Sequence, residues 1–537
     1  MKKILKQLLL LFILIPGTIF TSQAQSCLKW ITDAGGNNDD GESEGKVIAV
    51  SNGYIVCGKT NSNYPAFGVP AGHGNDAYVS KYDVDGNIVW RHIYGGSGED
   101  FFNTITQTDD GGFIAAGHTS SNDGDVSGNH GGDEDAWVVK ISGTGILQWQ
   151  KCYGGSDNDV FLSITAEATG YIITGTTNSR DGDITSWFGN YDVWIVKLSL
   201  TGTIAWQSNY GGSKFEESRG IVRNTDGTYT FAGATLSSNQ QVGSHAGGSY
   251  DTWVVKISST GNIIWKKVYG GKGYDYCNTI ARTSDGNIVL GQSSNSTDGD
   301  VNGTGAFAMW LLKINPQSGD IIWSKTFLGS PLGTSCFGIF STSDGGVISL
   351  GSTGSANDVT WDAFILAVDV NGNKKWSSFL GGTKSDYAKT GVQISNEDLI
   401  ILCSSASTDV DFAGGSGSPD IWLAKFHNCD NNIITKASPA NSIIETNTYK
   451  FSAYPNPFSS ATTISFSLAQ STKVSLNVFD LNGRLISTLA NEEMQAGNHL
   501  IKWGINAVNE KSISSGIYLL RIEAGDFKDT KRVLVIK

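Results

Sequence analysis

Apolar and polar residues follow this chain in short β-rich runs separated by Gly and Asp, and stretches with the 3.6-residue period of an amphipathic helix are nearly absent. Gly is abundant (67 of 537 residues) and Met is scarce (3), which suits many strands joined by tight turns. In one representative stretch the expected strands are residues 104–108, 113–119, 136–142 and 146–153. The pattern predicts an all-β chain built from four-stranded units.

The unit recurs seven times. Its last strand carries a Trp, and these residues stand 53 to 60 positions apart: Trp30, Trp90, Trp149, Trp206, Trp265, Trp323 and Trp376. Its third strand opens with an Asp two residues before an aromatic side chain: Asp76, Asp135, Asp192, Asp251, Asp362 and Asp420, while the fifth copy, Ala308-Met309-Trp310, keeps the aromatic and loses the Asp. Four strands with this period predict a seven-bladed β-propeller.

The order of the strands predicts how the ring closes. The chain begins with a lone Trp strand, residues 27–31, and its last repeat stops after the strand at residues 420–426. The first strand would therefore complete the seventh blade in a 3+1 arrangement, which leaves no unpaired strand edge at the junction. Cys27 and Cys429 flank this junction and are the candidate disulfide, because they would lie at the ends of neighbouring strands in an oxidising compartment.

The N-terminus has the three parts of a secretory signal. Lys2, Lys3 and Lys6 precede an apolar run over residues 8–15 and a small-residue site that ends at Ala24, where we expect cleavage. Acylation of Cys27 as a lipoprotein is the alternative, although Ala24 stands where a lipobox has Leu. The apolar run is too short for a permanent anchor, and no later segment is apolar enough to span a membrane.

Charge excludes one class of partner. The formal net charge of the chain is −13, and it becomes −16 when the three lysines of the signal segment are removed. Residues from 441 onward carry a net +2, so the propeller holds about −18. Nucleic acid is not expected as a partner, because phosphate binding needs a basic face.

The periodicity stops after Cys429, and a different set of motifs follows a polar linker. These residues are Tyr454, Pro455, Asn456, Pro457 and Phe458, then Asp480, Asn482, Gly483 and Arg484, then Gly516 and Tyr518. In this order they closely resemble the type A C-terminal sorting domain of the type IX (Por) secretion system of Bacteroidetes. The resemblance implies export through the periplasm and the outer membrane by the type IX machinery, removal of the tail, and release or attachment to surface lipopolysaccharide. Alternating runs in the tail predict a small antiparallel β-sandwich.

We therefore expect four parts along the chain. They are a signal peptide (1–24), the seven-bladed propeller (25–429), a linker (430–450) and the sorting domain (451–537). The mature protein is expected to be secreted or held on the outer cell surface.

One loop has the ligand spacing of a calcium site. Asp123, Asp125, Ser127, Asn129 and Glu134 supply oxygens at positions 1, 3, 5, 7 and 12 of an EF-hand-like loop, with Gly128 at position 6. Partial copies occur at residues 181–185 and 298–302, and more loosely at Asp409 and Asp411. The alternative is a series of Asx turns that stabilise long loops, and no helix pair flanks the segment. Calcium is the only candidate cofactor.

The hairpin that ends Thr260-Gly261-Asn262-Ile263-Ile264-Trp265 resembles the Trp-docking hairpin of quinoprotein-like propellers. Quinoprotein enzymes usually have eight blades and nothing here matches their cofactor ligands, so pyrroloquinoline quinone is not expected. The repeated Trp residues are expected to pack between blades, although exposed aromatics can also stack on sugars.

The sequence shows no nucleophile elbow, phosphate loop or catalytic triad, so we assign no catalytic residue. The leading hypothesis is a surface or secreted binding protein for a glycan or a protein. The alternatives are an extracellular glycoside-active, endoglucanase-like enzyme with two carboxylates in the propeller channel, and a purely structural adhesin.

Overall fold

The computed structural model describes residues 28–33, 45–60, 74–427 and 451–536, apart from 244–248, 302, 304, 355–359, 396–397, 413–418, 455, 457, 459, 469–470, 482, 496, 505–512 and 526. The expected signal peptide, the linker, Cys27 and Cys429 lie outside the described residues. The chain divides into two compact units, Met1–Ile433 and Ile434–Lys537.

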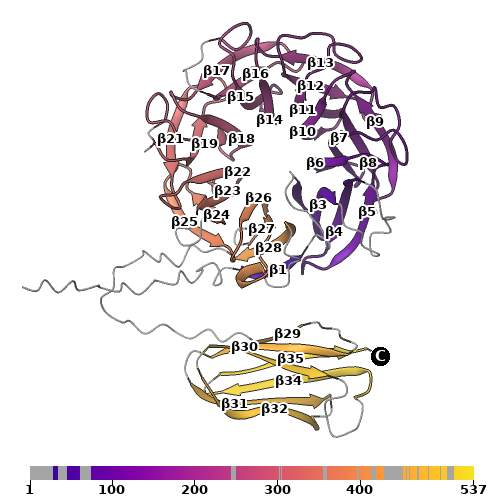
Figure 1. Ribbon diagram of the computed structural model, residues 1–537, viewed down its shortest axis with the longest axis vertical. Coiled ribbons are helices and arrows are strands. Elements are labelled where there is room, and N and C mark those ends of the chain that lie inside the picture. The colour runs from indigo at the N-terminus through magenta and orange to yellow at the C-terminus, as the bar shows by residue number, and fades with distance from the viewer. Residues whose placement is uncertain are drawn as a thin grey trace, which may run out of the picture. The chain divides into compact units, whose positions relative to one another are not determined.

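The first unit is a β-propeller of seven four-stranded antiparallel sheets (Figure 1). The first blade contains β2 (Lys46–Val50), β3 (Gly53–Thr60), β4 (Asp76–Tyr82) and β5 (Ile88–Tyr94), and the second contains β6 (Asp100–Gln107), β7 (Phe113–Thr119), β8 (Asp135–Ile141) and β9 (Leu147–Tyr153). The third blade contains β10 (Asp159–Glu167), β11 (Gly170–Thr177), β12 (Asp192–Leu198) and β13 (Ile204–Tyr210), and the fourth contains β14 (Glu216–Arg223), β15 (Tyr229–Thr235), β16 (Asp251–Ile257) and β17 (Ile263–Tyr269). The fifth blade contains β18 (Asp275–Arg282), β19 (Ile288–Ser294), β20 (Ala308–Ile314) and β21 (Ile321–Phe327), the sixth contains β22 (Thr334–Ser341), β23 (Val347–Gly354), β24 (Trp361–Val368) and β25 (Lys374–Leu380), and the seventh contains β26 (Asp386–Gln393), β27 (Asp398–Ser405), a 3-10 turn at Val410–Phe412 and β28 (Asp420–His427). The first strand of each blade is innermost, and these strands contact one another in a closed circle.

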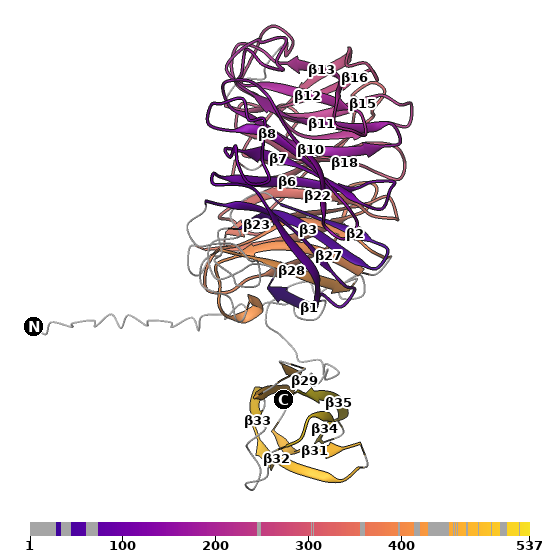
Figure 2. The ribbon, with the colours of Figure 1, turned by 90° about the vertical axis from the view of Figure 1, so that its right-hand side faces the viewer.

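The ring closes by the predicted 3+1 arrangement. Strand β1 (Leu28–Asp33) pairs antiparallel with β28 and completes the seventh blade, with Leu28 opposite Phe426. Figure 2 shows β1 beside β28 from the side of the ring. The predicted disulfide between Cys27 and Cys429 remains a prediction.

Each blade docks a Trp onto the next blade. A Cβ atom at Gly86 would lie 2.9 Å from the indole of Trp30, and Gly202 meets Trp149 at the same distance. Both glycines have a positive φ in the hairpin between third and fourth strands, so the tight turn and the close approach both require Gly. The indole N–H groups of Trp206, Trp265 and Trp323 donate to carbonyls of the following hairpin at 3.0 to 3.1 Å. These tryptophans therefore pack between blades.

The innermost strands begin earlier than the sequence pattern indicated. Strand β6 starts at Asp100 rather than at residue 104, because this carboxylate is fully buried and hydrogen-bonded to neighbouring loops. The five cysteines in the described residues are free thiols inside strands, and burial raises the pKa of Cys57 and Cys277 to about 12. They are unreactive core residues.

The second unit is a small pair of antiparallel sheets with a common core. One sheet has the order β29 (Phe451–Tyr454), β30 (Ala461–Leu468), β33 (Gly497–Gly504), and the other has the order β32 (Leu485–Met494), β31 (Thr472–Asp480), β34 (Gly516–Ala524), β35 (Phe527–Val535). Trp503 is fully buried between Phe458 and Tyr518, whose ring centroids lie 5.3 and 5.7 Å away. Among the described residues no helix is both long enough and apolar enough to cross a membrane.

Candidate functional site

The first two predicted calcium ligands, Asp123 and Asp125, form hydrogen bonds with the segment that connects two blades. Asp123 Oδ1 accepts a hydrogen bond from the backbone N–H of Ser97 at 2.7 Å, and the N–H of Asp125 donates to the carbonyl of Gly95 at 2.8 Å. The first bond recurs in four other blades, from Ser156 to Asp181, Ser213 to Asn239, Lys272 to Asp298 and Thr383 to Asp409. Because the neutral amide of Asn239 accepts the same hydrogen bond, this interaction does not depend on a negative charge.

The other three predicted ligands contact different neighbours. Ser127 Oγ accepts from Gln150 at 2.8 Å, and the amide of Asn129 donates to the Thr119 carbonyl at 3.4 Å. Glu134 lies 3.8 Å from His118, and burial followed by repulsion from Asp133 and Glu99 raises its pKa. Within the described ranges, no three His, Cys, Asp or Glu side chains converge as a metal-binding group. Calcium binding by this loop remains a prediction.

A substitution tests the calcium hypothesis. It predicts that a chelator lowers the melting temperature of the wild-type protein and does not change that of Asp125→Ala, which lacks a hard oxygen ligand. Binding to the folded state alone would add about 2.7 kcal/mol of stability at a calcium concentration a hundredfold above the dissociation constant. Equal melting of the wild type with and without chelator would assign the loop to hydrogen-bonded turns.

A repeated hydrogen bond brings together two residues at the mouth of five blade junctions. The backbone N–H of the residue that opens an innermost strand donates to the carbonyl of the residue just before the third strand of the preceding blade, at 2.7 to 2.9 Å. The acceptor residues are, in order, Asn75, Glu134, Tyr191, Tyr250 and Phe307. The residues just before the donors are Glu99, Asn158, Phe215, Tyr274 and Gly333. These positions are polar in the first two junctions and mainly aromatic in the next three.

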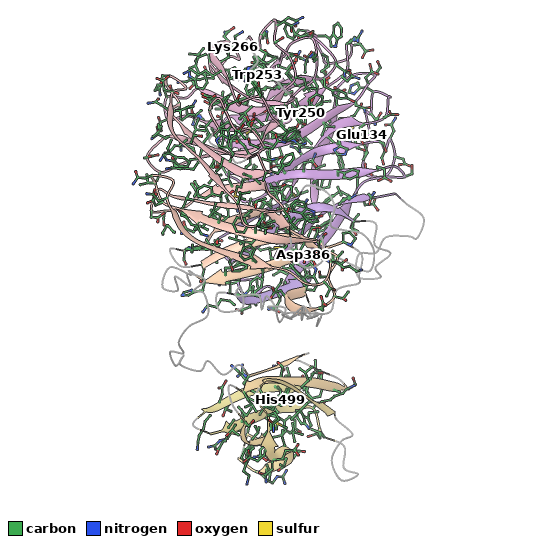
Figure 3. The ribbon with its side chains drawn as sticks, turned by 60° about the vertical axis from the view of Figure 1, so that its left-hand side comes forward. Glu134, Tyr250, Trp253, Lys266, Asp386 and His499 are labelled. Atoms are coloured by element: carbon green, nitrogen blue, oxygen red, sulfur yellow. The ribbon has the colours of Figure 1, made fainter. Side chains whose placement is uncertain are left out.

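The aromatic positions form a continuous group, which we call the aromatic arc: Tyr191, Phe215, Tyr250, Tyr274, Tyr276 and Phe307. Successive ring centroids, from Tyr191 to Phe215, Tyr250, Tyr274 and Phe307, lie 5.6 to 5.9 Å apart. Tyr276 stacks nearly parallel on Tyr274 at 5.6 Å and contacts Tyr250 at 5.3 Å. All six side chains are partly or largely exposed, in contrast to the fully buried third-strand Trp137, Trp194 and Trp310. Tyr250 is labelled in Figure 3.

An ion pair supports the arc from β14. Arg219 Nε lies 2.9 Å from Glu217 Oε1, and a terminal nitrogen of Arg219 donates to the Tyr276 hydroxyl at 3.1 Å. The guanidinium also lies over the Tyr276 ring, 5.7 Å from its centroid. Burial raises the pKa of Glu217 to about 8 and lowers the pKa of Arg219. The pair places hydrogen-bonding groups next to aromatic faces.

Two surface features flank the arc. Next to Phe307 lies a shallow hollow lined by Ala306, Leu328, Gly329, Ser330 and Pro331. In the loop before β12, the guanidinium of Arg180 lies 3.8 Å from the ring centroid of Trp187, which is 42% exposed. The third blade therefore carries a further exposed ring, four residues before Tyr191 in the chain.

The predicted sorting motifs hold the second unit together. The side chain of Asn456 bonds to the Arg532 carbonyl and the Leu534 N–H, at 2.9 and 2.7 Å. Phe458 extends this contact through paired backbone bonds to Leu534 and Ile536. Pro455, Pro457 and Asn482 lie outside the described residues, as does the side chain of Tyr454.

The second and third motifs make a turn and a buried contact. Asp480 and Arg484 close a turn around Gly483, whose φ is +78°, through backbone bonds and an ion pair of 3.2 Å. Gly516 opens β34, and Tyr518 on that strand packs on Trp503 and donates its hydroxyl to the Ser514 carbonyl.

Comparison with protein families decides what this unit is. Residues 452–537 match the family of secretion system C-terminal sorting domains. This part of the chain is a type IX secretion sorting domain. The sorting domain implies an interaction with the type IX machinery and delivery to the outer surface or the medium. The protein is thus a propeller exported by type IX secretion.

Three solved structures that are similar to this chain share 9 to 11% of its sequence. No curated protein matches the chain. PorZ of Porphyromonas gingivalis, described as an essential bacterial surface component of the type IX secretion system, is similar at 11% identity with a TM-score of 0.37; the alignment covers 94% of this chain and 60% of PorZ. The Neurospora crassa Pan2 WD40 domain is similar at 9% identity and a TM-score of 0.39, covering 76% of this chain and 90% of that domain. Pyrococcus horikoshii acylaminoacyl peptidase is similar at 10% identity and a TM-score of 0.38, covering 80% of this chain and 58% of the peptidase. This chain spans less than two thirds of the length of PorZ and of the peptidase.

Proposed function

We propose that the propeller is an exported binding module that takes an extracellular glycan on the aromatic arc. The observation that carries this proposal is a contiguous group of six partly exposed aromatic rings along three consecutive blade junctions, whereas the corresponding residues of the first two junctions are polar. Such rings are normally buried, and a contiguous exposed group of this kind marks a binding surface.

The chemistry of the arc suits a sugar. Aromatic faces stack on the apolar C–H faces of pyranose rings, while Tyr hydroxyls provide the polar end that such a ligand also needs. Arg219 and Glu217 supply a donor and an acceptor beside Tyr276. The net charge of about −18 on the propeller favours a neutral ligand over an anionic one.

A matched pair of substitutions tests the site. Tyr276 and Tyr387 both occupy the second position of an innermost strand, but Tyr387 lies outside the arc, against Phe337 at 6.0 Å. We expect Tyr276→Ala to weaken binding to glycans identified on an array by about tenfold, because an aromatic contact is worth up to about 1.5 kcal/mol beyond its area. Tyr387→Ala should bind as the wild type does.

Other outcomes would redirect the proposal. Equal losses in both variants would place the ligand in the channel rather than on the arc. Release of reducing sugar from a bound glycan by the wild-type protein would favour the glycoside-active enzyme over a binding module. Absence of binding to any glycan on the array would reject the proposed ligand class.

A further inference from the structure

Carboxylates are buried in pairs between neighbouring blades. One member opens the third strand of a blade and the other opens the first strand of the next blade. Among the fully buried members are Asp135, Asp159, Asp192, Glu216, Asp251, Asp275 and Asp386. Carboxylates are almost never this buried without a cationic partner, yet within the described part of the chain no cation forms an ion pair with Asp192 or Glu216.

A glycine lies next to both carboxylates in three of the pairs, at Gly95, Gly211 and Gly270. At Gly270, a Cβ atom would lie 2.5 Å from Asp251 Oδ1 and 2.9 Å from Asp275 Oδ2. At Gly211 the corresponding atoms are Asp192 Oδ1 and Glu216 Oε2. Both acids of a pair therefore lie next to the same glycine, and their carboxylates are close neighbours.

Hydrogen-bond donors are unevenly shared in the pair Asp192 and Glu216. Glu216 accepts from the Gly212 N–H at 2.6 Å and from the Thr235 hydroxyl at 2.7 Å. Asp192 Oδ2 accepts from the N–H groups of Phe188 and Gly189, but Asp192 Oδ1 is buried and has no hydrogen-bond partner. A proton on this oxygen would remove the unpaired acceptor and the second buried charge at once.

The fifth junction shows that the two acids belong together. There the third strand opens with Ala308 and the next innermost strand opens with Thr334, so both carboxylates are missing. The Thr334 hydroxyl still accepts from the Gly329 N–H at 2.7 Å, as Glu216 accepts from Gly212. The loop therefore needs an acceptor but not a charge, and the third-strand Asp is absent where its partner is absent.

We propose that the pair of Asp192 and Glu216 takes up one proton in mild acid and shares it across the blade junction, so that the ring is more stable at low pH. The Asp192 carboxyl would donate its proton towards Glu216, joining the third blade to the fourth. This inference concerns the ring itself and does not depend on the ligand of the arc.

The direction of the pKa shifts agrees with this geometry. Burial raises the pKa of Asp192 to about 6, and repulsion from Glu216 adds to the effect. The pKa of Asp159 also rises to about 6 and that of Asp386 to about 7, mainly through burial. A carboxyl whose folded pKa is raised contributes stability at acidic pH, and this contribution is lost between the unfolded value near 4 and the folded value.

Among the described residues, Glu216 is the charged group that acts on the pKa of Asp192. From the fourth blade, Gln241 stands where other blades have an Asp, and its amide oxygen accepts from the Gly211 N–H. Nearby, Tyr210 on β13 donates to the Gly261 carbonyl, Glu217 pairs with Arg219, and Lys214 is exposed. This junction is therefore the cleanest place for a test.

The test compares Asp192→Asn with the full-length mature protein in denaturant titrations from pH 4 to pH 8. The Asn amide mimics the protonated acid, so the variant should match the wild type at pH 4 and exceed its stability at pH 8. The ratio of the two unfolding constants should change about a hundredfold over this range, since the pKa rises by about two units. The exposed Asp109→Asn in a hairpin turn is the control and should show a constant ratio.

Two outcomes would overturn the proposal. One is a constant ratio for Asp192→Asn at every pH, which would mean that the pair does not take up a proton on folding. The other is a wild-type protein stabilised by calcium at pH 8 and a variant that is not, which would show a shared cation instead. If Asp192→Asn does not fold, Glu216→Gln at the same junction provides the comparison, because it also leaves the pair with one charge at every pH.

Discussion

A variant that begins at Gly35, without strand β1, should lose much of the stability of the propeller although it lacks only a few mature residues. The seventh blade would lose its fourth strand, and Leu28, Trp30 and Ile31 would leave two core clusters. Each such side chain would contribute about 1.5–3 kcal/mol if fully buried, and these three are partly buried, so we expect a loss of about 2–4 kcal/mol in the free energy of unfolding. Denaturant unfolding of the purified propeller measures this loss.

Controls separate the closing strand from the mere length of the N-terminus. Lys29→Ala changes an exposed residue of the same strand and should leave stability unchanged. A synthetic peptide of residues 26–33, added to the truncated protein, should restore part of the lost stability because it can pair with the exposed edge of β28. Identical unfolding of the truncated and full-length propellers would show that β1 does not close the ring.

The repeat made most of the propeller predictable. Each blade repeats one pattern, so a strand that is hard to recognise in one copy can be recognised from the other copies. The order of the strands then assigns the lone strand of Trp30 to the incomplete seventh blade. The innermost strands were the exception. Their first residues, such as Asp100 and Phe101, look like loop residues because the signal for burial lies in the neighbouring blade.

The aromatic arc could not be predicted in the same way. Five of its six residues lie between strands, where the repeat pattern is weakest, and Tyr191 meets Phe215 because a backbone bond joins consecutive blades. One signal was present in the sequence. The residue before each third-strand Asp changes from Asn75 and Glu134 to Tyr191 and Tyr250, and a comparison of the repeats at that position would have singled out the aromatic half.

The buried acid pairs illustrate a different limit. The sequence showed the third-strand Asp in six copies but gave it no partner. Only the packing of adjacent blades shows that a second acid faces it across a glycine. Charge burial is a property of two blades together, so a pattern within one repeat cannot reveal it.

Deletion of residues 452–537 should abolish delivery to the cell surface and leave a folded propeller in the periplasm. The sorting domain has its own core around Trp503, and the propeller has separate core clusters, so each unit retains its packing without the other. Surface labelling of the deletion strain should fall to background while the periplasmic fraction gains the protein. The purified propeller should melt at its usual temperature.

Two point variants on β33 make the same test without removing the tail. Trp503→Ala empties the core of the sorting domain, and loss of a buried Trp costs about 3–5 kcal/mol, which is a large part of the stability of so small a domain. Export should therefore fall nearly as far as in the deletion. Leu500→Ser changes a residue that is 73% exposed and should be exported normally. Wild-type surface levels in the deletion strain would mean that the export signal lies elsewhere in the chain, and normal export of Trp503→Ala would mean that the machinery reads the motifs without the folded domain.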